Sequence, residues 1–370
     1  MIKVLVTGSK GFIGRNLTVS LAQRKDLEVL SFDVDNDPSA LPALVEQADF
    51  IVHLAGVNRP EKVEEFIAGN TGLTESLISI LLACGKLTPV LISSSIQASQ
   101  DNSYGLSKRA AESVVFDYGK QTGASVFVYR LPNVFGKWCR PNYNSAVATF
   151  CHNITHDLPI QVNDPSVVMN LVYVDDVVAS FIASIDGFLP PGEGFCEVQP
   201  VHTARLGEVA DLVRSFWNSR EERTVPNLGD PLTKKLYSTY LSYLPTDSFS
   251  YPLKMNVDER GSFTEFVRTA DRGQVSVNVS RPGVTKGNHW HHTKNEKFLV
   301  VSGSGVIRFR KVGSDEVISY EVSGDRLEVV DIPVGYTHNI SNTGTTDMVT
   351  VMWCNELFDA ENPDTFFEPV

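Results

Sequence analysis

The first 15 residues read Met1-Ile-Lys-Val-Leu-Val-Thr7-Gly8-Ser9-Lys10-Gly11-Phe12-Ile13-Gly14-Arg15, and this stretch decides the fold of the first part of the chain. An apolar run of strand type leads into the spacing Gly-x-x-Gly-x-x-Gly and then into a helical pattern. Gly8 permits a tight turn, Gly11 lets the backbone approach a pyrophosphate, and Gly14 lets helix and strand pack closely. Turns need glycine in many folds, but the position at the first strand–helix junction indicates a dinucleotide-binding loop.

The residues after this loop alternate short apolar runs with helical patterns. Such alternation predicts an α/β fold, a Rossmann-type parallel sheet covered by helices on both faces. The predicted strands are Ile2–Val6, Glu28–Phe32, Phe50–Leu54, Val90–Ser94 and Val126–Arg130. The predicted helices are Phe12–Arg24, Glu61–Ala83, Tyr104–Thr122, Asn144–Ile154, Asp175–Ile185 and Leu206–Trp217.

After Met255 the pattern changes to short strands separated by Gly, Asn, Asp or Ser, which predicts an all-β antiparallel barrel or jelly roll. The stretch Leu241–Leu253 contains Pro245 and Pro252 and marks a domain boundary. We therefore predict a first domain over 1–245, a linker over 246–255 and a second domain over 256–370. The predicted strands of the second domain are Gln274–Ser280, Lys297–Ser302, Gly305–Arg310, Val317–Val322, Arg326–Asp331 and Met348–Cys354.

Length and composition exclude several classes of function. A chain of 370 residues suits two domains rather than one core. Its formal net charge of −12, without a basic cluster, argues against nucleic acid or an anionic membrane as partner. We expect no signal peptide and no apolar run long enough to span a bilayer. The five scattered cysteines, with no Cys-x-x-Cys pair, are typical of reduced thiols in a cytoplasmic protein.

Asp33 ends the second predicted strand, where a carboxylate can accept hydrogen bonds from an adenosine ribose. It can equally be a surface residue at a strand end. Asp33 disfavours a cofactor with a 2′-phosphate, whereas Arg15 could bind one, so the residues leave NAD versus NADP open.

Tyr104-Gly-Leu-Ser-Lys108 places a phenol and an ammonium on one face of a predicted helix. A nearby ammonium favours the phenolate, so we expect it to lower the pKa of Tyr104 and let that residue exchange a proton at neutral pH. Ser93-Ser94-Ser95 ends the strand just upstream, where a hydroxyl could hydrogen-bond the same substrate oxygen. Tyr and Lys at this spacing are also common on ordinary amphipathic helices, and only the surrounding elements make the pair specific.

In combination these motifs resemble the extended short-chain dehydrogenase/reductase family over about residues 1–245. The resemblance rests on the glycine loop, His53-Leu54-Ala55-Gly56, Ser93–Ser95, Tyr104-x-x-x-Lys108, Arg130-Leu-Pro-Asn133-Val-Phe-Gly136 and Tyr173-Val-Asp-Asp176. It implies that Ser95 polarises the substrate oxygen, Tyr104 is the acid/base, Lys108 binds the nicotinamide ribose and Asn133 lies near the substrate's diphosphate. The implied cofactor contacts are Thr7, Gly8, Gly11, Phe12, Ile13, Gly14, Arg15, Asp33, Leu54, Ala55, Gly56, Tyr104 and Lys108.

One departure from that family narrows the chemistry. Members that eliminate water usually have an Asp-Glu pair directly after the catalytic Ser or Thr, but here Ile96 and Gln97 follow Ser95. The groups for elimination are absent, which disfavours a dehydratase and leaves simple carbonyl reduction.

The second domain contains a candidate metal site of His289, His291, Glu296 and His338. Alternate residues of a strand share a face, so His289 and His291 can point the same way. This ligand set suits Zn, Fe, Mn or Ni. A His-rich surface loop, or a barrel that has lost its metal, is the competing interpretation, and His292 and Lys294 are solvated or act as acid/base groups.

The surrounding spacing resembles the cupin family. Gly283-x5-His289-x-His291-x4-Glu296-x6-Gly303 matches the first cupin motif, and Pro333-x-Gly335-x2-His338-x3-Asn342 matches most of the second. Leu327 stands where the leading glycine of the second motif is expected, a departure that affects a turn.

The whole chain resembles a family of bifunctional capsular polysaccharide enzymes, by the order of its two domains and by stretches such as Phe135-Gly-Lys-Trp-Cys139, Gly261-Ser-Phe-Thr-Glu-Phe266 and Gly287-Asn-His-Trp-His-His-Thr-Lys-Asn-Glu-Lys-Phe298. That resemblance implies a homodimer with zinc in the cupin, on the route to UDP-N-acetyl-L-fucosamine. The cupin would epimerise C3 of a UDP-2-acetamido-2,6-dideoxy-4-hexulose, which is a UDP-4-keto-6-deoxy-N-acetylhexosamine. The first domain would then reduce C4 with NADPH, NADH being the alternative, to a UDP-2-acetamido-2,6-dideoxy-L-talose. Asp33 fits poorly with NADPH.

Two other functions compete with this one. In the first, the protein is only a reductase, and its cupin serves dimerisation or stability. In the second, it is a non-enzymatic nucleotide sensor, against which the set Ser95, Tyr104 and Lys108 argues, because a sensor needs no proton donor.

Overall fold

The computed structural model describes residues 1–59, 62–187, 194–269, 271–357, 359, 361 and 363–370. The chain divides into two compact units. The α/β unit comprises Met1–Ser215 and Gly229–Pro245, and the β unit comprises Phe216–Leu228 and Thr246–Val370. The sequence placed Phe216–Leu228 in the first domain, but Arg223 of this segment accepts a backbone hydrogen bond from Arg268 at 2.8 Å and pairs with Glu265 at 2.7 Å. The segment is thus tied to the β unit by main-chain pairing as well as by charge.

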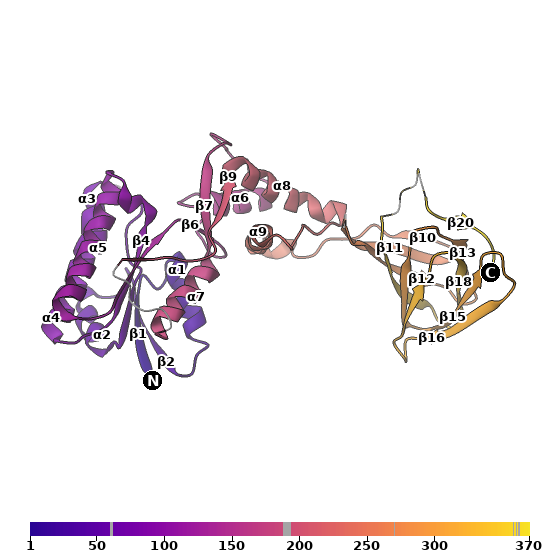
Figure 1. Ribbon diagram of the computed structural model, residues 1–370, viewed down its shortest axis with the longest axis horizontal. Helices are drawn as coiled ribbons and strands as arrows, with labels where there is room; N and C mark the ends of the chain where they lie inside the picture. Colours follow the sequence, from indigo (N-terminus) through magenta and orange to yellow (C-terminus); the bar gives the residue numbers. More distant parts are fainter. Residues whose placement is uncertain (60–61, 188–193, 270, 358, 360, 362) are drawn as a thin grey trace. The chain divides into compact units, whose positions relative to one another are not determined.

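The α/β unit is built on the predicted parallel sheet (Figure 1), whose six strands run in the order β2-β1-β3-β4-β5-β8. Their bounds are β1 Ile2–Thr7, β2 Leu27–Phe32, β3 Phe50–His53, β4 Val90–Ser95, β5 Val126–Leu131 and β8 Phe195–Cys196. Val4 and Val6 pack on one face with Leu17 and Phe181, while Leu5 packs on the other with Leu77. The central strands are therefore continuously apolar, because both of their faces are buried.

Helices cover both faces of this sheet (Figure 1). Those beside Val4 and Val6 are α1 (Phe12–Leu21) and α7 (Val174–Ile185), and those beside Leu5 are α2 (Leu41–Gln47), α4 (Leu73–Cys84) and α5 (Ser103–Thr122). The Asn102 side chain caps α5 by accepting a hydrogen bond from the Gly105 amide at 2.7 Å. That cap starts the helix one residue before Tyr104 and so fixes Tyr104 in its first turn.

The remaining elements of the α/β unit lie around this core. The predicted helix Glu61–Ala83 is interrupted: α3 (Glu64–Phe66), a π turn (Ile67–Gly72) and α4 follow one another within its described part. A small sheet joins β6 (Asn133–Phe135), β7 (Val168–Tyr173) and β9 (His202–Arg205). The other helices are α6 (Ala146–Thr155), α8 (Leu206–Glu222), which ends in the β unit, and α9 (Pro231–Leu241), which the sequence analysis missed. Short 3₁₀ turns occur at Pro38–Ala40 and Ile96–Ser99, and a third, Thr246–Ser248, belongs to the β unit.

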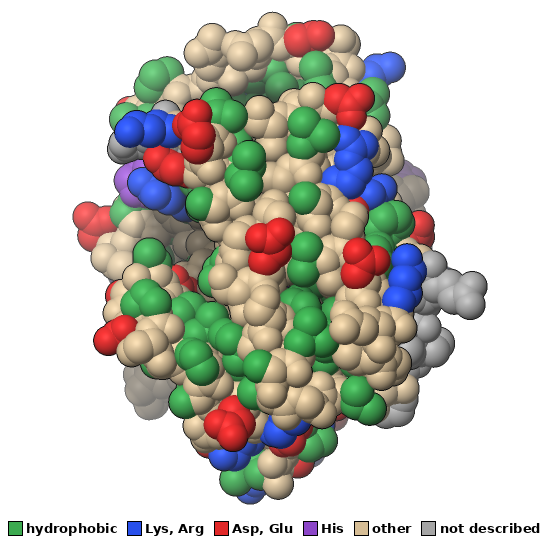
Figure 2. Space-filling view, turned by 90° about the vertical axis from the view of Figure 1, so that its left-hand side faces the viewer, with side chains coloured by type: hydrophobic (Ala, Val, Ile, Leu, Met, Phe, Trp, Pro, Cys, Tyr) green, Lys and Arg blue, Asp and Glu red, His purple; other side chains and the backbone are tan. Residues whose placement is uncertain are grey.

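The expectation that no apolar run is long enough to cross a membrane needs correction. Within the described residues, the helical stretch Glu64–Cys84 is long and apolar enough to cross a membrane, judged by length and composition alone. Leu77 and Leu81 of this stretch are buried against the sheet, and core helices of soluble proteins have the same length and composition. The face of the molecule on the left of Figure 1 has acidic, basic and apolar side chains interspersed (Figure 2).

The β unit consists of two antiparallel sheets, which confirms the predicted all-β second domain. One has the order β10-β11-β12-β19-β14-β17 and the other β16-β15-β18-β13-β20. Phe298 and Val300 of the first sheet pack against Ile307 and Phe309 of the second. The bounds are β10 Asn256–Asp258, β11 Gly261–Thr269, β12 Gly273–Ser280, β13 Thr285–Trp290, β14 Glu296–Ser302, β15 Ser304–Lys311, β16 Val317–Ser323, β17 Val329–Ile332, β18 Tyr336–Asn342, β19 Met348–Cys354 and β20 Phe366–Phe367.

Candidate functional site

The glycine loop between β1 and α1 has no room for side chains. Gly8 has a φ of +69°, and a Cβ there would lie 2.6 Å from the Ala55 nitrogen. A Cβ on Gly14 would lie 2.0 Å from the Gly8 carbonyl oxygen. Gly11 is the N-cap of α1 and provides no side-chain cap, so amides of the first helical turn remain available to an anion. The loop therefore fits the pyrophosphate of a dinucleotide.

This loop opens into a cavity of about 1250 Å³ at the carboxyl ends of the strands. The cavity contains most of the residues that the sequence singled out: Gly8, Gly11, Phe12, Ile13, Gly14, Asp33, Leu54, Ala55, Gly56, Ser95, Tyr104, Lys108 and Asn133. Two predicted cofactor contacts lie outside the lining. The Thr7 hydroxyl hydrogen-bonds His53 Nδ1 at 2.7 Å, and the Arg15 guanidinium stacks on Trp138 at 4.6 Å from the ring centroid.

His53, part of the motif that carried the family resemblance, is a structural residue. Its ring is buried and bridges Thr7 to Thr74, whose hydroxyl lies 3.0 Å from Nε2. Burial, with a smaller effect from Lys108, lowers the pKa of His53 to about 3. The ring is therefore neutral at physiological pH and holds the loop after β3 in place.

Asp33 lies at the end of β2 and lines the cavity, with both carboxylate oxygens engaged by the backbone. Lys10 donates its amide to Oδ2 at 2.6 Å, and Val34 donates its own to Oδ1 at 2.8 Å. Lys10 also forms an ion pair with Asp35. The carboxylate of Asp33 thus lies at this edge of the cavity, while the Arg15 guanidinium stacks on Trp138.

Ser95, Tyr104 and Lys108 converge on the same cavity. Burial raises the pKa of Tyr104, which a hydrogen bond with Ser95 partly offsets and the nearby Tyr143 reinforces. The expectation that the pKa of Tyr104 is lowered is therefore wrong, because the effect of burial dominates. Lys108 is itself buried, donates to the Ser93 carbonyl at 3.3 Å, and has its pKa lowered to about 8 by burial. Tyr104 is accordingly held as a protonated phenol, the form that can donate a proton.

A buried ion pair behind this group was missed by the sequence analysis. Glu112 lies one helical turn after Lys108 and accepts hydrogen bonds from Ser94 Oγ at 2.5 Å and from Arg130 at 2.6 and 2.9 Å. The Arg130 guanidinium also lies 3.7 Å from the Phe195 ring centroid. The pairing joins β4, α5 and β5, the elements that position Ser95 and Lys108. The i, i+4 spacing of Lys108 and Glu112 was the available signal.

Asn133, the predicted substrate contact, lies on β6 at the rim of the cavity. Its side-chain amide donates to the Asn170 carbonyl at 3.2 Å, and the residue is exposed. Within the described part of the chain, no protein group donates a hydrogen bond to the side-chain oxygen of Asn133.

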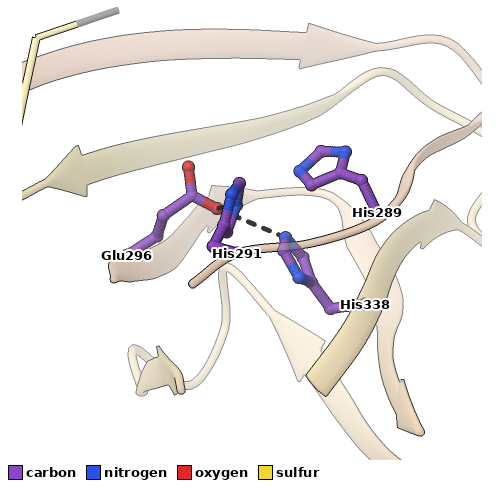
Figure 3. A group of neighbouring side chains, drawn as sticks. All are labelled: His289, His291, Glu296 and His338. Atoms are coloured by element: carbon purple, nitrogen blue, oxygen red, sulfur yellow. Dashed lines mark ion pairs between the residues drawn. The ribbon is translucent and has the colours of Figure 1, made fainter. Parts of the chain in front are cut away.

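The four predicted metal ligands come together in the β unit (Figure 3). One candidate ligand atom from each of His289, His291, Glu296 and His338 lies within 4.8 Å of the others. They come from the end of β13, the residue after it, the start of β14 and β18. A bulge between Gly287 and His289, with Asn288 at a φ of +63°, turns His289 toward His338, its partner across the strands.

The polar atoms of this group fit a metal ion. His291 Nε2, Glu296 Oε2 and both ring nitrogens of His338 are buried without a hydrogen-bond partner within the described part of the chain. Glu296 Oε2 lies 3.2 Å from His338 Nε2 and 3.5 Å from His291 Nε2. Burial would raise the pKa of Glu296, but these imidazoles and Lys294 outweigh it and hold that pKa well below its usual range. Burial lowers the pKa of His289 to about 4. A carboxylate with neutral imidazoles is the protonation state that binds divalent ions.

A C-terminal strap, residues 363–370, holds the loop that follows β13. The Asp364 carboxylate accepts backbone hydrogen bonds from His292, Thr293 and Lys294 at 2.7–2.9 Å. Its carbonyl oxygen accepts a hydrogen bond from His291 Nδ1, which directs Nε2 toward the other ligands. Sequence patterns give no signal for this arrangement, because the strap and the loop lie about 70 residues apart.

Beside the ligands lies a cavity of about 680 Å³. His289, Glu296 and His338 line it together with three cations, Arg260, Lys286 and Lys294. The Lys294 ammonium lies 3.6 Å from Glu296 Oε1, which places an amine directly beside the metal ligands. His292 is exposed and packs on Trp290 and Phe366, outside this lining.

Comparison with known proteins covers the whole chain. The model of the NAD dependent epimerase/dehydratase family matches residues 4–188, and that of the polysaccharide biosynthesis C-terminal domain matches residues 256–366. A UDP-2-acetamido-2,6-beta-L-arabino-hexul-4-ose reductase from Pseudomonas aeruginosa is 50% identical over 99% of this chain and 98% of its own length. The crystal structure of the capsular polysaccharide assembling protein CapF from Staphylococcus aureus matches with a TM-score of 0.94 and 54% identity, covering both chains fully. CapF with the inhibitor 3-isopropenyl-tropolone matches with a TM-score of 0.90 and 51% identity, again over both full chains.

Proposed function

Because the chain belongs to the NAD dependent epimerase/dehydratase family and ends in a polysaccharide biosynthesis C-terminal domain, we propose that it is a bifunctional enzyme of UDP-sugar metabolism. The β unit epimerises C3 of a UDP-2-acetamido-2,6-dideoxy-4-hexulose, and the α/β unit reduces C4 with NADPH or NADH to a UDP-2-acetamido-2,6-dideoxy-L-talose. The protein acts as a cytoplasmic homodimer. The observation that carries this proposal is the 50% identity, over nearly the whole length, to a reductase of a UDP-linked hexul-4-ose.

The reduction uses the three residues that converge in the larger cavity. When bound, the nicotinamide cofactor supplies a hydride to C4. Tyr104 donates its proton to the C4 oxygen as negative charge develops there, and the raised pKa keeps that proton available. Ser95 hydrogen-bonds the same oxygen, while Lys108 binds the nicotinamide ribose from the floor of the cavity. Asn133 at the rim contacts the substrate's diphosphate.

The epimerisation exploits the acidity that the C4 ketone gives to the C3 hydrogen. A base removes that proton, and a proton returned to the other face inverts C3. A bound divalent ion supplies positive charge against the oxyanion that forms at C4. His289, His291, Glu296 and His338 would hold the ion, and zinc is the metal we propose. Lys294 is a better candidate than His292 for moving the proton, because only Lys294 lines the cavity.

The chemistry of an inhibitor crystallised with a CapF relative is compatible with a metal-dependent enzyme. A tropolone has adjacent carbonyl and hydroxyl oxygens, a pair that chelates divalent ions. The relative was crystallised with 3-isopropenyl-tropolone and is 51% identical to this chain.

A single experiment tests both activities. The full-length protein is incubated with the UDP-4-keto-6-deoxy-N-acetylhexosamine in D2O, with and without NADPH or NADH, and the products are followed by NMR. Deuterium at C3 without cofactor, and a C4 alcohol only with it, is the expected result. Reduction without any C3 exchange would contradict the epimerase and leave a reductase.

The competing function, a reductase with a structural β unit, is favoured by one observation: four protein ligands are enough to close a zinc tetrahedron. Chelation separates the two. If the ion is catalytic, chelation abolishes C3 exchange while the β unit stays folded. If the ion is structural, chelation lowers the melting temperature of the β unit whenever C3 exchange falls.

A further inference from the structure

The cavity of the β unit contains a cation without an obvious protein counter-charge. The Lys286 ammonium donates to the side-chain oxygen of Asn278 at 2.7 Å and to the Val279 carbonyl at 2.9 Å, and both acceptors are neutral. The carboxylate that acts on it, Asp258, is already paired with Arg260 at 2.6 Å. Lys294, the other lysine of the cavity, is paired with Glu296. Lys286 is thus the cation here whose charge is least neutralised among the described residues.

The surroundings of Lys286 favour an external anion. Burial lowers its pKa, which means that the charged form is destabilised where it lies. Partly buried charges are retained in proteins where a partner compensates them. The protein has a net charge of −12, yet the cavity lining has three cations, Arg260, Lys286 and Lys294, against two carboxylates, Asp258 and Glu296.

The spacing along β13 fits a nucleotide sugar. Lys286 precedes His289 by three residues, which at the rise of a strand is a separation of about 10 Å, less the effect of the bulge. A nucleotide sugar has its diphosphate on C1 and its reactive carbons across the hexose ring. An anion at Lys286 therefore leaves the hexose free to reach the metal ligands within the same cavity.

We propose that Lys286, with Arg260 beside it, binds the diphosphate of the nucleotide sugar in the cavity of the β unit. This inference rests on the proposed function and deepens it, since it assigns the anion-recognising part of the epimerase site. The chain then has two separate places for a UDP group, one in each unit.

Titration calorimetry with UDP tests the site without any catalysis. Full-length wild-type protein is expected to bind two UDP molecules per chain, and Lys286→Met one. Lys286→Arg keeps the charge and should keep both. The matched control is Lys297→Met, because Lys297 lies on β14, the next strand along the chain, pairs with Asp331 and lies outside the cavity. UDP binding by Lys286→Met with wild-type stoichiometry and affinity would overturn the assignment.

C3 exchange provides the second readout. Losing a hydrogen bond to a charged group should raise KM for exchange about 10-fold to 100-fold in Lys286→Met, far more than it lowers kcat. Arg260→Met should also raise KM for exchange. Because Arg260 is exposed, this variant replaces Lys286→Met if the latter has a lowered melting temperature. An unchanged KM in both variants contradicts the inference. If the wild-type protein shows no exchange at all, the proposed epimerase fails, and the UDP titration still decides whether Lys286 binds the anion.

Discussion

At the scale of single residues, the chemistry of the α/β unit depends on the phenol of Tyr104. Burial raises the pKa of this phenol, and a hydrogen bond with Ser95 offsets part of that rise. Both the burial and the hydrogen bond follow from the position of Tyr104 in the first turn of α5. The sequence supplied the identity of Tyr104 and Lys108 but the wrong sign for the pKa shift. Spacing on a helix gives proximity, whereas burial and the direction of the ammonium depend on the whole cavity.

Tyr104→Phe is expected to abolish reduction and spare exchange at C3. Removing a general acid typically costs about 10²-fold to 10⁴-fold in rate, and nothing in the β unit depends on this phenol. Consumption of NADPH and C3 deuterium incorporation, measured on the same preparation, check it. Cofactor consumption at the wild-type rate would show that another group donates the proton.

Asp33 is expected to decide cofactor preference, and Arg15 is not. Asp33 lines the cavity, while Arg15 stacks on Trp138 outside it. A carboxylate repels a 2′-phosphate, so Asp33→Ala should raise kcat/KM for NADPH relative to NADH by about 10-fold. Arg15→Ala should leave that ratio within about 3-fold, because a residue stacked outside the cavity contributes no charge to the phosphate position. A collapse of NADPH use in Arg15→Ala would mean that the guanidinium leaves Trp138 when cofactor binds.

At the scale of elements, the ligand group depends on how β13 ends. The bulge at Asn288 aims His289 at His338, and the C-terminal strap holds the next residues through Asp364. The ligand types were predictable from His-x-His and Glu spacing. The strand β13 itself was not, because Lys286, Gly287, Asn288 and His289 lack the apolar alternation that indicates a strand. Its polar residues face a cavity, so the usual hydrophobic signal is missing.

Asp364→Ala is expected to weaken metal binding about 10-fold to 100-fold, the range for residues that orient metal ligands. The carboxylate fixes three successive amides, and without it His291 and Lys294 lose their fixed positions. Zinc retention in a chelator competition measures this, with Asp331→Ala as the control for an exposed carboxylate of the same unit. Equal retention in the two variants would show that the strap does not position the ligands.

At the scale of the whole molecule, the two chemistries occupy separate compact units. Each unit was recognisable from its own pattern: strand–helix alternation for the first, and short strands between turn residues for the second. The assignment of Phe216–Leu228 to the β unit could not be predicted, because the sequence of this segment does not indicate that Arg223 pairs with β11. Helix α9 (Pro231–Leu241) was missed although Asp230 followed by Pro231 is a typical helix start, which the structure shows as an N-cap.

Two inactive variants are expected to complement each other. Tyr104→Phe retains the site of the β unit, and His338→Ala retains the site of the α/β unit. If the C3-epimerised ketone is released between steps, an equimolar mixture should form the C3-epimerised C4 alcohol, which neither variant forms alone. The C4 alcohol is measured by NMR in the mixture and in each variant. No product from the mixture, while each variant keeps its single step, would mean that the intermediate is not released.

The five free thiols offer a route for chemical labelling. Cys84 at the end of α4 is exposed, while Cys139 and Cys151 are buried, and burial raises the pKa of Cys139 to about 11. Because alkylation requires the thiolate, a maleimide at neutral pH should react first at Cys84, away from the residues that line either cavity. Mass spectrometry of the labelled peptides would show whether one dye per chain can be attached there, giving a fluorescent reporter that leaves both chemistries intact.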